Sequence, residues 1–263
     1  MSSPLLEVRA AGFAYRQEPV LNDISLAIGE GEFIGVIGPN GSGKSTLLKV
    51  LGGYLPVQRG SALFKAEPIR RCPKKILARS IAWVPQEHSM AFPFHVLEIV
   101  MMGRHPYLSP LRFETEEDHR AAEKALALTG TSALAGRRFD AISGGEKQRV
   151  LMAGAIAQET AILLLDEPTA ALDLKYQMEI LSILKHLNEE EHKTLVVALH
   201  DLHLASRFCR RLILLDRGAI AKDGPPAEVL TPEVLEPVYG VRVRLQDDGE
   251  GGVHITPEAP CTL

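Results

Sequence analysis

Residues 38–45 read Gly38-Pro39-Asn40-Gly41-Ser42-Gly43-Lys44-Ser45, which fits the phosphate-binding pattern of Gly, four residues, Gly, Lys and Ser or Thr. The apolar run Phe33–Ile37 before this stretch predicts a buried strand, and Thr46–Leu51 after it predicts a helix. A strand, a glycine-rich loop and a helix in this order gather backbone N–H groups and a helix N-terminus around one point. The stretch therefore predicts a cradle for a polyphosphate.

The side chains of the loop favour a nucleoside triphosphate over other phosphate ligands. Lys44 places a positive charge where β- and γ-phosphates would lie, and the Ser45 hydroxyl suits Mg²⁺. A dinucleotide-binding loop would need its second and third glycines at another spacing, and it has no role for Lys44. A glycine-rich turn that matches by chance is the other alternative.

Composition narrows the class of protein. The 263 residues are 46% apolar, which is enough for one large or two small domains, and the net charge of −4 gives no basic footprint for nucleic acid. Met1–Glu7 lacks the features of a secretory signal, and Ile162–Leu165 is far shorter than the about 20 residues of a membrane helix. The three cysteines are odd in number and widely separated, which indicates neither a disulfide framework nor a zinc site. We therefore expect a cytosolic chain whose membrane role depends on a partner.

The chain before residue 90 shows β patterns. Residues 5–35 alternate apolar and polar positions and predict an antiparallel β layer, in which Tyr15 either stacks on an adenine ring or packs in the sheet. Ser61–Ala66 and Ser80–Val84 predict two more strands. Gln86 follows the second of these strands, downstream of the phosphate loop, which distinguishes it from an ordinary surface amide.

Between about residues 94 and 158 the spacing becomes helical, and this predicts a helical subdomain inserted into an α/β core. The expected helices are Val96–Gly103, Thr115–Thr129 and Gly145–Gln158. Ser143 and Glu146 predict a helix cap and capping box at the start of the third helix. The glycine pair between them exposes N–H groups at a helix N-terminus, which predicts a second anion site.

Two later strands end in polar residues. Ile162–Leu165 predicts a buried parallel strand that ends at Asp166 and Glu167, where Asp166 suits Mg²⁺ and Glu167 suits a base that takes a proton from water. A strand-ending acidic turn is the structural alternative. Leu195–Leu199 repeats the pattern and ends at His200, which we expect to contact the γ-phosphate.

The last part of the chain predicts small elements. Leu212–Leu215 and Ala219–Ala221 flank Asp216-Arg217-Gly218 as in a hairpin. Short helices are expected at Pro226–Leu230 and Pro232–Tyr239. From Asp247 onwards the sequence is turn-like, and we expect a poorly ordered tail.

With these motifs assembled, nearly the whole chain resembles the ATP-binding cassette (ABC) ATPases. The matching motifs are the Walker A loop at Gly38–Ser45, the Q-loop at Gln86, the signature helix at Ser143–Gln148, the Walker B strand at Ile162–Glu167, the D-loop at Ala171–Asp173 and the H-loop at His200. Small departures occur at Ile142, Glu146 and Ala170, and none removes a charge or a phosphate ligand. The segments Met102–Tyr107 and His200–Val241 are most similar to the subfamily that imports iron-siderophores, haem and cobalamin.

The resemblance implies an α/β fold of the P-loop NTPase class, with a parallel central sheet, an N-terminal antiparallel β layer and the inserted helical subdomain. It implies one ABC ATPase domain over residues 1–263, with the subdomain at about 94–158 and a C-terminal extension at about 241–263. It implies ATP binding by Tyr15, Gly38, Pro39, Asn40, Gly41, Ser42, Gly43, Lys44, Ser45, Thr46, Ser143, Gly144, Gly145 and Asp173, Mg²⁺ binding by Ser45, Gln86 and Asp166, and hydrolysis by Glu167, His200 and Gln86.

The expected assembly follows from the same resemblance. Members of the family work as dimers that hold two ATP molecules between their chains, on the cytoplasmic face of the inner membrane, bound to permease subunits and indirectly to a substrate-binding protein. Cargo is chosen by other chains, so an ABC ATPase for another substrate is an alternative. Soluble ABC ATPases of DNA repair or translation are a further alternative, although the chain has neither sustained heptads nor a second Walker A motif. A P-loop kinase would lack the signature helix.

Overall fold

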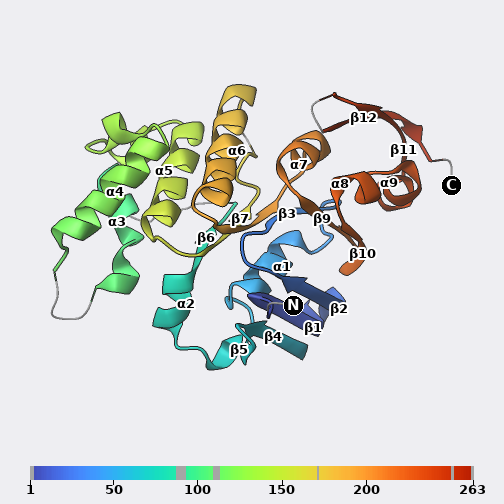
Figure 1. Ribbon diagram of the computed structural model, residues 1–263, viewed down its shortest axis with the longest axis horizontal. Helices are drawn as coiled ribbons and strands as arrows, with labels where there is room; N and C mark the ends of the chain where they lie inside the picture. Colours follow the sequence, from blue (N-terminus) through green and yellow to red (C-terminus); the bar gives the residue numbers. More distant parts are fainter. Residues whose placement is uncertain (1–2, 87–92, 109–112, 171, 250–251, 262–263) are drawn as a thin grey trace. The chain divides into compact units, whose positions relative to one another are not determined.

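The computed structural model describes residues 3–86, 93–108, 113–170, 172–249 and 252–261. The chain forms two compact units (Figure 1). Unit 1 consists of Met1–Cys72 and Thr194–Leu263, and unit 2 is Pro73–Lys193.

Unit 1 contains a largely parallel set of strands. Strand β3 (Phe33–Ile37) lies between β8 (Thr194–Ala198) and β9 (Arg211–Asp216), and it pairs with both in parallel. Strand β10 (Ala219–Gly224) pairs with β9 in the antiparallel hairpin that the sequence predicts. Every residue of β3 and β8 is buried, as expected for parallel strands covered on both faces.

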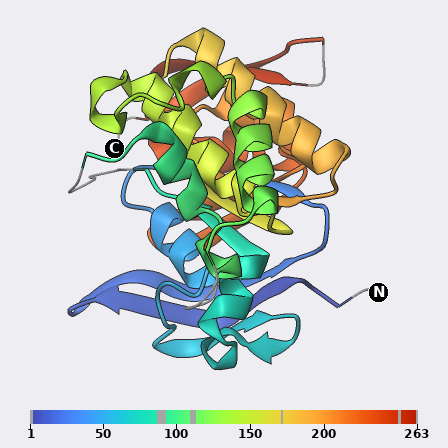
Figure 2. The same cartoon turned by 90° about the vertical axis from the view of Figure 1, so that its left-hand side faces the viewer.

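The second sheet of unit 1 is the antiparallel layer that the N-terminal alternation predicts (Figure 2). Its order is β2 (Glu18–Ile28), β1 (Leu6–Tyr15), β4 (Arg59–Phe64) and β5 (Glu67–Pro68). Strand β4 ends at Phe64 and not at Ala66, because Lys65 and Ala66 take positive φ angles of 49° and 65° in the turn to β5.

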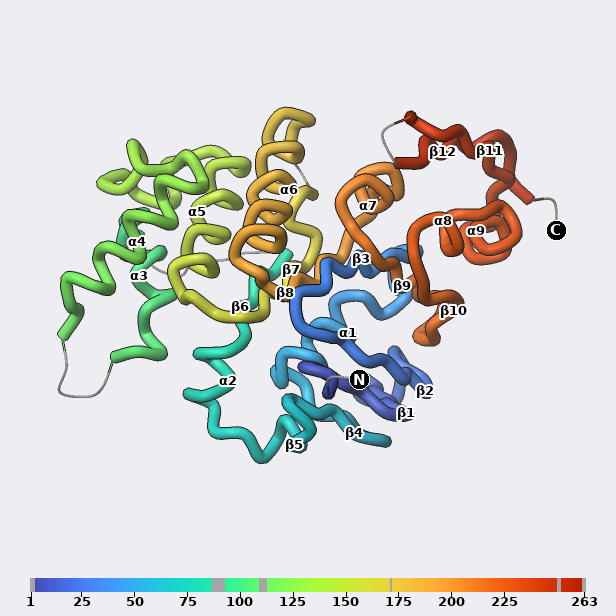
Figure 3. Tube along the Cα trace, viewed as in Figure 1, coloured from blue at the N-terminus to red at the C-terminus, as the bar shows by residue number. Residues whose placement is uncertain are grey.

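The rest of unit 1 comprises short helices and a C-terminal hairpin (Figure 3). The helices are α1 (Lys44–Leu51), the 3-10 helix η1 (Ile69–Arg71), α7 (Leu202–Phe208), α8 (Pro226–Val229) and α9 (Pro232–Tyr239). Strands β11 (Val241–Asp247) and β12 (Val253–Pro260) then pair antiparallel.

The expectation of a poorly ordered tail after Asp247 is therefore wrong. The turn-like composition belongs to the connection of a hairpin, where Asp248 Oδ1 accepts a hydrogen bond of 2.8 Å from Gly252 N. Strand β12 continues beyond this turn because its backbone pairs with β11 from Val253 to Pro260.

Unit 2 combines one parallel strand pair with helices. Strands β6 (Ile81–Val84) and β7 (Ile162–Asp166) run parallel, and every residue of β7 is buried. The helices are α2 (Lys74–Ser80), α3 (Val96–Met102), η2 (His105–Tyr107), α4 (Glu116–Leu128), η3 (Ser132–Leu134), η4 (Phe139–Ala141), α5 (Gly144–Ala157) and α6 (Leu174–Glu189).

The three helices predicted from periodicity enclose a shared apolar core. Helices α3, α4 and α5 lie side by side in Figure 1, and Val100, Leu126 and Val150 are among their buried contacts. Helices α2, α6 and α7 were not predicted from the sequence. Among the described residues, no helix has the length and apolar character needed to cross a membrane.

Candidate functional site

The phosphate loop of unit 1 needs glycine at particular positions. Gly38 and Gly43 have φ angles of 144° and 105°, a range that disfavours residues with a Cβ. A Cβ on Gly38 would lie 2.2 Å from the carbonyl oxygen of Leu215, and one on Gly43 would lie 2.9 Å from Leu21 Cδ2. The loop thus fits closely against β2 and β9 only because these side chains are missing.

Polar groups point into the loop. Lys44 is only 5% exposed, and its Nζ donates hydrogen bonds of 2.9 Å to the Gly38 carbonyl and 3.1 Å to the Pro39 carbonyl. The hydroxyl of Ser42 is buried and has no hydrogen-bond partner within the described part of the chain. A buried hydroxyl of this kind is costly unless a polar ligand satisfies it, so the loop fits a phosphate group. Ser45 and Thr46 follow in the first turn of α1.

One residue behind the loop was not singled out from the sequence. Burial raises the pKa of the Tyr239 hydroxyl to about 12, and a hydrogen bond with the Gly38 backbone opposes this rise. Tyr239 is the last residue of α9, so the C-terminal part of unit 1 reaches the first glycine of the loop. A tyrosine in a short helix far along the chain gives no signal of this contact.

The other two unit 1 residues of the predicted site lie at strand ends. Tyr15 ends β1 and is 43% exposed, and its ring packs edge-on against Phe13 with centroids 4.9 Å apart. Tyr15 is therefore held by the sheet while part of its ring remains open to a ligand. His200 follows β8 and is exposed, and Asp201 caps α7 by accepting a hydrogen bond of 3.0 Å from Leu204 N.

In unit 2 the structure brings three predicted site residues together. Asp166 and Glu167 stand at the end of β7 and are 3% and 8% exposed. Gln86 follows the neighbouring strand β6, and its Nε2 donates a hydrogen bond to Glu167 Oε2. The register, which pairs Val84 with Leu165, explains why these side chains meet.

The backbone at Glu167 is unusual. Its φ angle is 52°, in the left-handed region that residues other than glycine seldom adopt. Such conformations cost free energy and occur often at functional sites. The sequence pattern located Glu167 but could not reveal this conformation.

The predicted second anion site is an open helix N-terminus. Ser143 caps α5, and the Glu146 carboxylate accepts hydrogen bonds of 2.8 Å from both the backbone N and the hydroxyl of Ser143. These bonds lower the pKa of Glu146. Ser143 and Gly144 are exposed, and an added Cβ on Gly144 would meet no atom within 4 Å, so the start of this turn is open to a ligand.

The D-loop motif lies only partly within the described residues, because Ala171 is outside them. Leu172 is 9% exposed. Asp173 is the N-cap of α6, where its carboxylate accepts a hydrogen bond of 3.0 Å from Tyr176 N. Asp173 therefore has a structural role as a helix cap, whatever else it contacts.

A buried arginine of unit 2 was missed as well. Arg104 is 3% exposed, and it donates hydrogen bonds to Asp118 (3.0 Å), Glu159 (2.6 Å) and the Ala157 carbonyl (2.8 Å). Burial raises the pKa of Asp118, but the hydrogen bonds of Thr115 and Arg104 outweigh this effect and hold it below its usual value. Arg104 thereby connects the end of α3 to α4 and to the end of α5.

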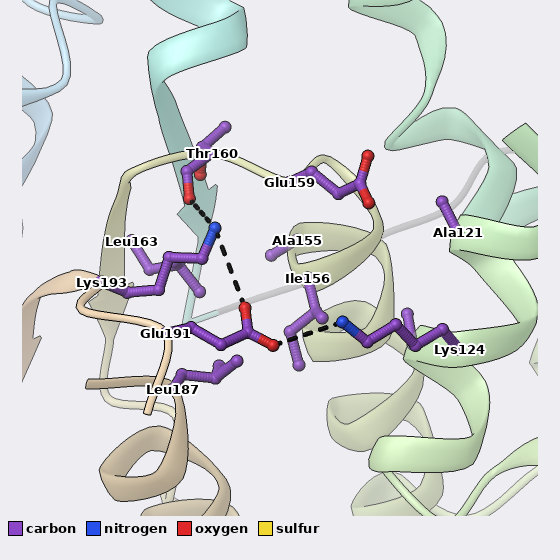
Figure 4. Close-up of a pocket in the computed structure, with 11 residues that line it drawn as sticks. Ala121, Lys124, Ala155, Ile156, Glu159, Thr160, Leu163, Leu187, Glu191 and Lys193 are labelled. Atoms are coloured by element: carbon purple, nitrogen blue, oxygen red, sulfur yellow. Dashed lines mark hydrogen bonds and ion pairs between the residues drawn. The ribbon is translucent and has the colours of Figure 1, made fainter. Parts of the chain in front are cut away.

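The described residues of unit 2 also line cavities away from these motifs. The first, of about 110 Å³, is shown in Figure 4, where Glu191 pairs with Lys124 (3.3 Å) and Lys193 (4.0 Å). It is smaller than the about 300–1,000 Å³ of ordinary ligand pockets, and its charges pair with one another.

The second cavity is an open groove of about 340 Å³ along α3, which we call the α3 groove. Its lining residues are Phe94, Leu97, Glu98, Met101, Met102, His105, Leu108, Glu114 and His119. Met102 is 43% exposed there, so part of the apolar lining faces solvent.

Comparison with known proteins gives a consistent result. The family model described as ABC transporter matches residues 21–170. The chain is 40% identical to a cobalamin import ATP-binding protein, BtuD, of Halobacterium salinarum over 90% of its own length, and it spans 60% of the length of that protein. It is also 40% identical to a hemin import ATP-binding protein, HmuV, of Thermobifida fusca over 95% of its length and 87% of that protein.

Solved structures agree with the sequence relatives. A chain of a metal-chelate type ABC transporter in an inward-facing conformation aligns with a TM-score of 0.84 and 31% identity, covering 97% of this chain and 98% of the other. A dimeric ATP-binding cassette bound to ADP and Pi aligns with a TM-score of 0.76 and 31% identity, covering 84% of this chain and 98% of the other.

Proposed function

The chain belongs to the ABC transporter family, and from this premise we propose that it is the ATP-hydrolysing subunit of an importer. Its cargo is a metal chelate, namely an iron-siderophore, haem or cobalamin, which crosses the membrane through a separate permease. The observation that carries the assignment of hydrolysis is the contact of Gln86 with Glu167, beside Asp166 at the ends of two parallel strands. The similarity to importers of cobalamin and hemin supports the class of cargo.

ATP is the substrate, and residues of unit 1 bind it. Tyr15 stacks on the adenine, and the loop from Gly38 to Thr46 surrounds the phosphates with backbone N–H groups. Lys44 leaves its loop carbonyls to meet the β- and γ-phosphates. The buried Ser42 hydroxyl gains a phosphate oxygen as its acceptor. His200 makes a polar contact with the γ-phosphate.

Residues of unit 2 carry out the chemical step. Glu167 accepts a proton from the water that attacks the γ-phosphate, and Gln86 orients the Glu167 carboxylate. Ser45, Gln86 and Asp166 supply the oxygen ligands that a Mg²⁺ ion prefers. A Mg²⁺ ion held by these residues would supply positive charge against the phosphates.

The active unit is a homodimer. Ser143, Gly144 and Gly145 form an open anion site at the start of α5, and they bind the γ-phosphate of the nucleotide held by the partner chain. Besides capping α6, Asp173 contributes to ATP binding at the same interface. A two-fold axis then creates two equivalent ATP sites, since each chain gives a phosphate loop to one and a helix N-terminus to the other. The dimeric cassette with bound ADP and Pi supports this arrangement.

The permease docks at the α3 groove. Leu97, Met101 and Met102 give it an apolar floor, and Glu98 and Glu114 add negative charge at its rim. An amphipathic permease helix with apolar and basic side chains fits this surface. The apolar stretch Met90–Phe94, which contains Pro93, also favours a contact near Gln86 and Phe92–Val96. Residues 87–92 lie outside the described part of the chain, whereas Phe94 lines the groove.

The chain acts as a peripheral subunit on the cytoplasmic face of the inner membrane, and the permease receives cargo from a substrate-binding protein. It binds no nucleic acid, in keeping with its net charge of −4. An ABC ATPase for another cargo is the second candidate, and a soluble ABC ATPase without a transport partner is the third.

The test is a gene deletion followed by uptake measurements with labelled iron-siderophore, haem and cobalamin. Uptake of at least one should collapse, and the wild-type gene should restore it while Glu167→Gln should not. Normal uptake of all three, in a strain without another importer for them, would show that the cargo assignment is wrong. The ATPase assignment would then be decided separately, by hydrolysis in the purified protein.

A further inference from the structure

The C-terminal hairpin is tied to helix α7 by hydrogen bonds. Ser206 Oγ accepts a bond of 2.9 Å from the backbone N–H of Val253 on β12, and it donates one of 2.7 Å to the His203 carbonyl within α7. The His203 ring also contacts Val253, because its Nδ1 lies 3.3 Å from the Val253 carbonyl oxygen. We call these bonds the Val253 latch, and Figure 3 shows β12 beside α7.

The acceptor in the latch is buried, and its partners are half-buried. Ser206 is 4% exposed, so loss of its hydroxyl would leave the Val253 N–H without its acceptor in a partly buried contact. The His203 ring also packs edge-on against His254, the next residue of β12, with centroids 5.4 Å apart. A ring contact and hydrogen bonds therefore fix the same side of α7.

Helix α7 begins two residues after His200. On the strand side, Leu199 N donates a bond of 3.0 Å to the Val36 carbonyl, which fixes the chain before His200. On the helix side, the Asp201 cap fixes only the first turn of α7 onto itself. The Val253 latch and the His254 ring contact both reach α7 at His203, a single turn from His200.

We propose that the C-terminal hairpin positions His200, with Ser206 and His203 as positioning residues that act through α7. The hairpin sets where the His200 side chain stands relative to the γ-phosphate, and it does not take part in holding the nucleotide. This proposal rests on the proposed function, because it requires His200 to act in hydrolysis.

The experiment separates turnover from nucleotide binding in the purified full chain. Ser206→Ala and His203→Leu each remove part of the latch, whereas His203→Asn keeps an N–H donor close to the place of Nδ1. Thr256→Ala is the matched control, since Thr256 lies on β12, is exposed and takes part in none of the three bonds of the latch. Each variant is assayed for kcat, for equilibrium binding of an ATP analogue that resists hydrolysis, and for its melting temperature.

We expect kcat to fall about tenfold in Ser206→Ala and His203→Leu, because a displaced group loses its alignment with the reacting atoms. Affinity for the analogue should stay within about twofold of wild type, since the phosphate loop is unchanged. His203→Asn should recover most of the turnover, and Thr256→Ala should behave as wild type.

Unchanged kcat in both latch variants would overturn the proposal. A parallel loss of kcat, affinity and melting temperature, shared by His203→Asn, would also overturn it, because the hairpin would then only support the fold. Full activity in His200→Ala would refute the proposed role of His200 in hydrolysis. That result is distinct from a failure of the hairpin proposal, because the variant leaves the hairpin unchanged.

Discussion

Gln86 Nε2 donates a hydrogen bond to Glu167 Oε2, although 80 residues of chain separate the two side chains. Both follow parallel strands that pair in register, and the carboxyl ends of such strands are where open α/β sheets bind ligands. The bond joins the residue expected to take a proton from water to one expected to hold Mg²⁺. A change that moves the loop after β6 would therefore also move the Glu167 carboxylate.

Replacement of Glu167 by Gln tests the role of this carboxylate. The amide keeps the size of the side chain and one hydrogen-bonding oxygen but cannot accept a proton at neutral pH. We expect ATP to bind and turnover to fall at least about 100-fold, by analogy with the loss of other transition-state groups. Size-exclusion chromatography should show a dimer that depends on ATP. A monomer at saturating ATP and Mg²⁺ would contradict the dimer with shared sites.

Replacement of Lys44 by Ala tests the phosphate loop. The change removes a buried positive charge that faces the loop carbonyls, and a polyphosphate then loses its closest cation. We expect hydrolysis to be abolished and ATP affinity to be severely weakened, as measured by phosphate release and by equilibrium binding. Lys49→Ala, in the last turn of the same helix, is the control and should remain active. Near-normal turnover in Lys44→Ala would remove the basis of the nucleotide assignment.

Active sites shared between chains can be tested by mixing two inactive variants. Ser143→Arg blocks the open start of α5, and Lys44→Ala disables the phosphate loop. In a mixed dimer both lesions fall on one composite site and leave the other intact. With random pairing and independent sites, an equal mixture should recover roughly a quarter of wild-type activity. No recovery, despite heterodimers proven by mass, would show that each site is contained in one chain.

The buried Arg104 predicts a specific pattern of stability. Arg104→Met leaves Asp118 buried without its cation, and we expect unfolding in urea to become easier by about 3–5 kcal/mol. The double variant Arg104→Met/Asp118→Leu should be less destabilised than the single one, because no unpaired charge remains. Arg79→Met is the control, since Arg104 and Arg79 both lie over the Tyr107 ring (4.1 Å and 5.0 Å) but Arg79 is exposed. Equal losses in the Arg104 and Arg79 variants would contradict this account.

Coupling to the permease can be separated from hydrolysis at the α3 groove. Met102→Asp places a charge on an exposed apolar residue of the groove, and we expect it to weaken association with the permease while basal ATPase activity stays near wild type. Ile76→Asp is the matched control, since Ile76 is 53% exposed on α2 and does not line the groove. The measurement is co-purification with the permease from membranes. Undiminished co-purification of the Met102→Asp protein would place the docking surface elsewhere.

Much of the fold was predictable because local patterns decide it. The buried run at Phe33–Ile37 and the alternation before it gave the observed strands, and the periodicity of Thr115–Thr129 gave α4. Helix α6, which is amphipathic and begins directly after Asp173 of the D-loop motif, was not predicted. The tail was misjudged because Asp and Gly residues that make a tight hairpin turn resemble those of an unstructured end.

The sequence by itself determined which residues are candidates for the site and their order along the chain. A glycine loop before a helix, a glycine pair after a cap and acidic residues after a buried strand each depend on neighbours a few positions away, so a local reading is sufficient. The sequence could not determine four contacts of the folded chain. These are the bond between Gln86 and Glu167, the Tyr239 contact with Gly38, the connections of Arg104 and the Val253 latch. Each of these depends on strand register or helix packing across 14 to 201 residues of chain, and only the folded chain brings such distant residues together.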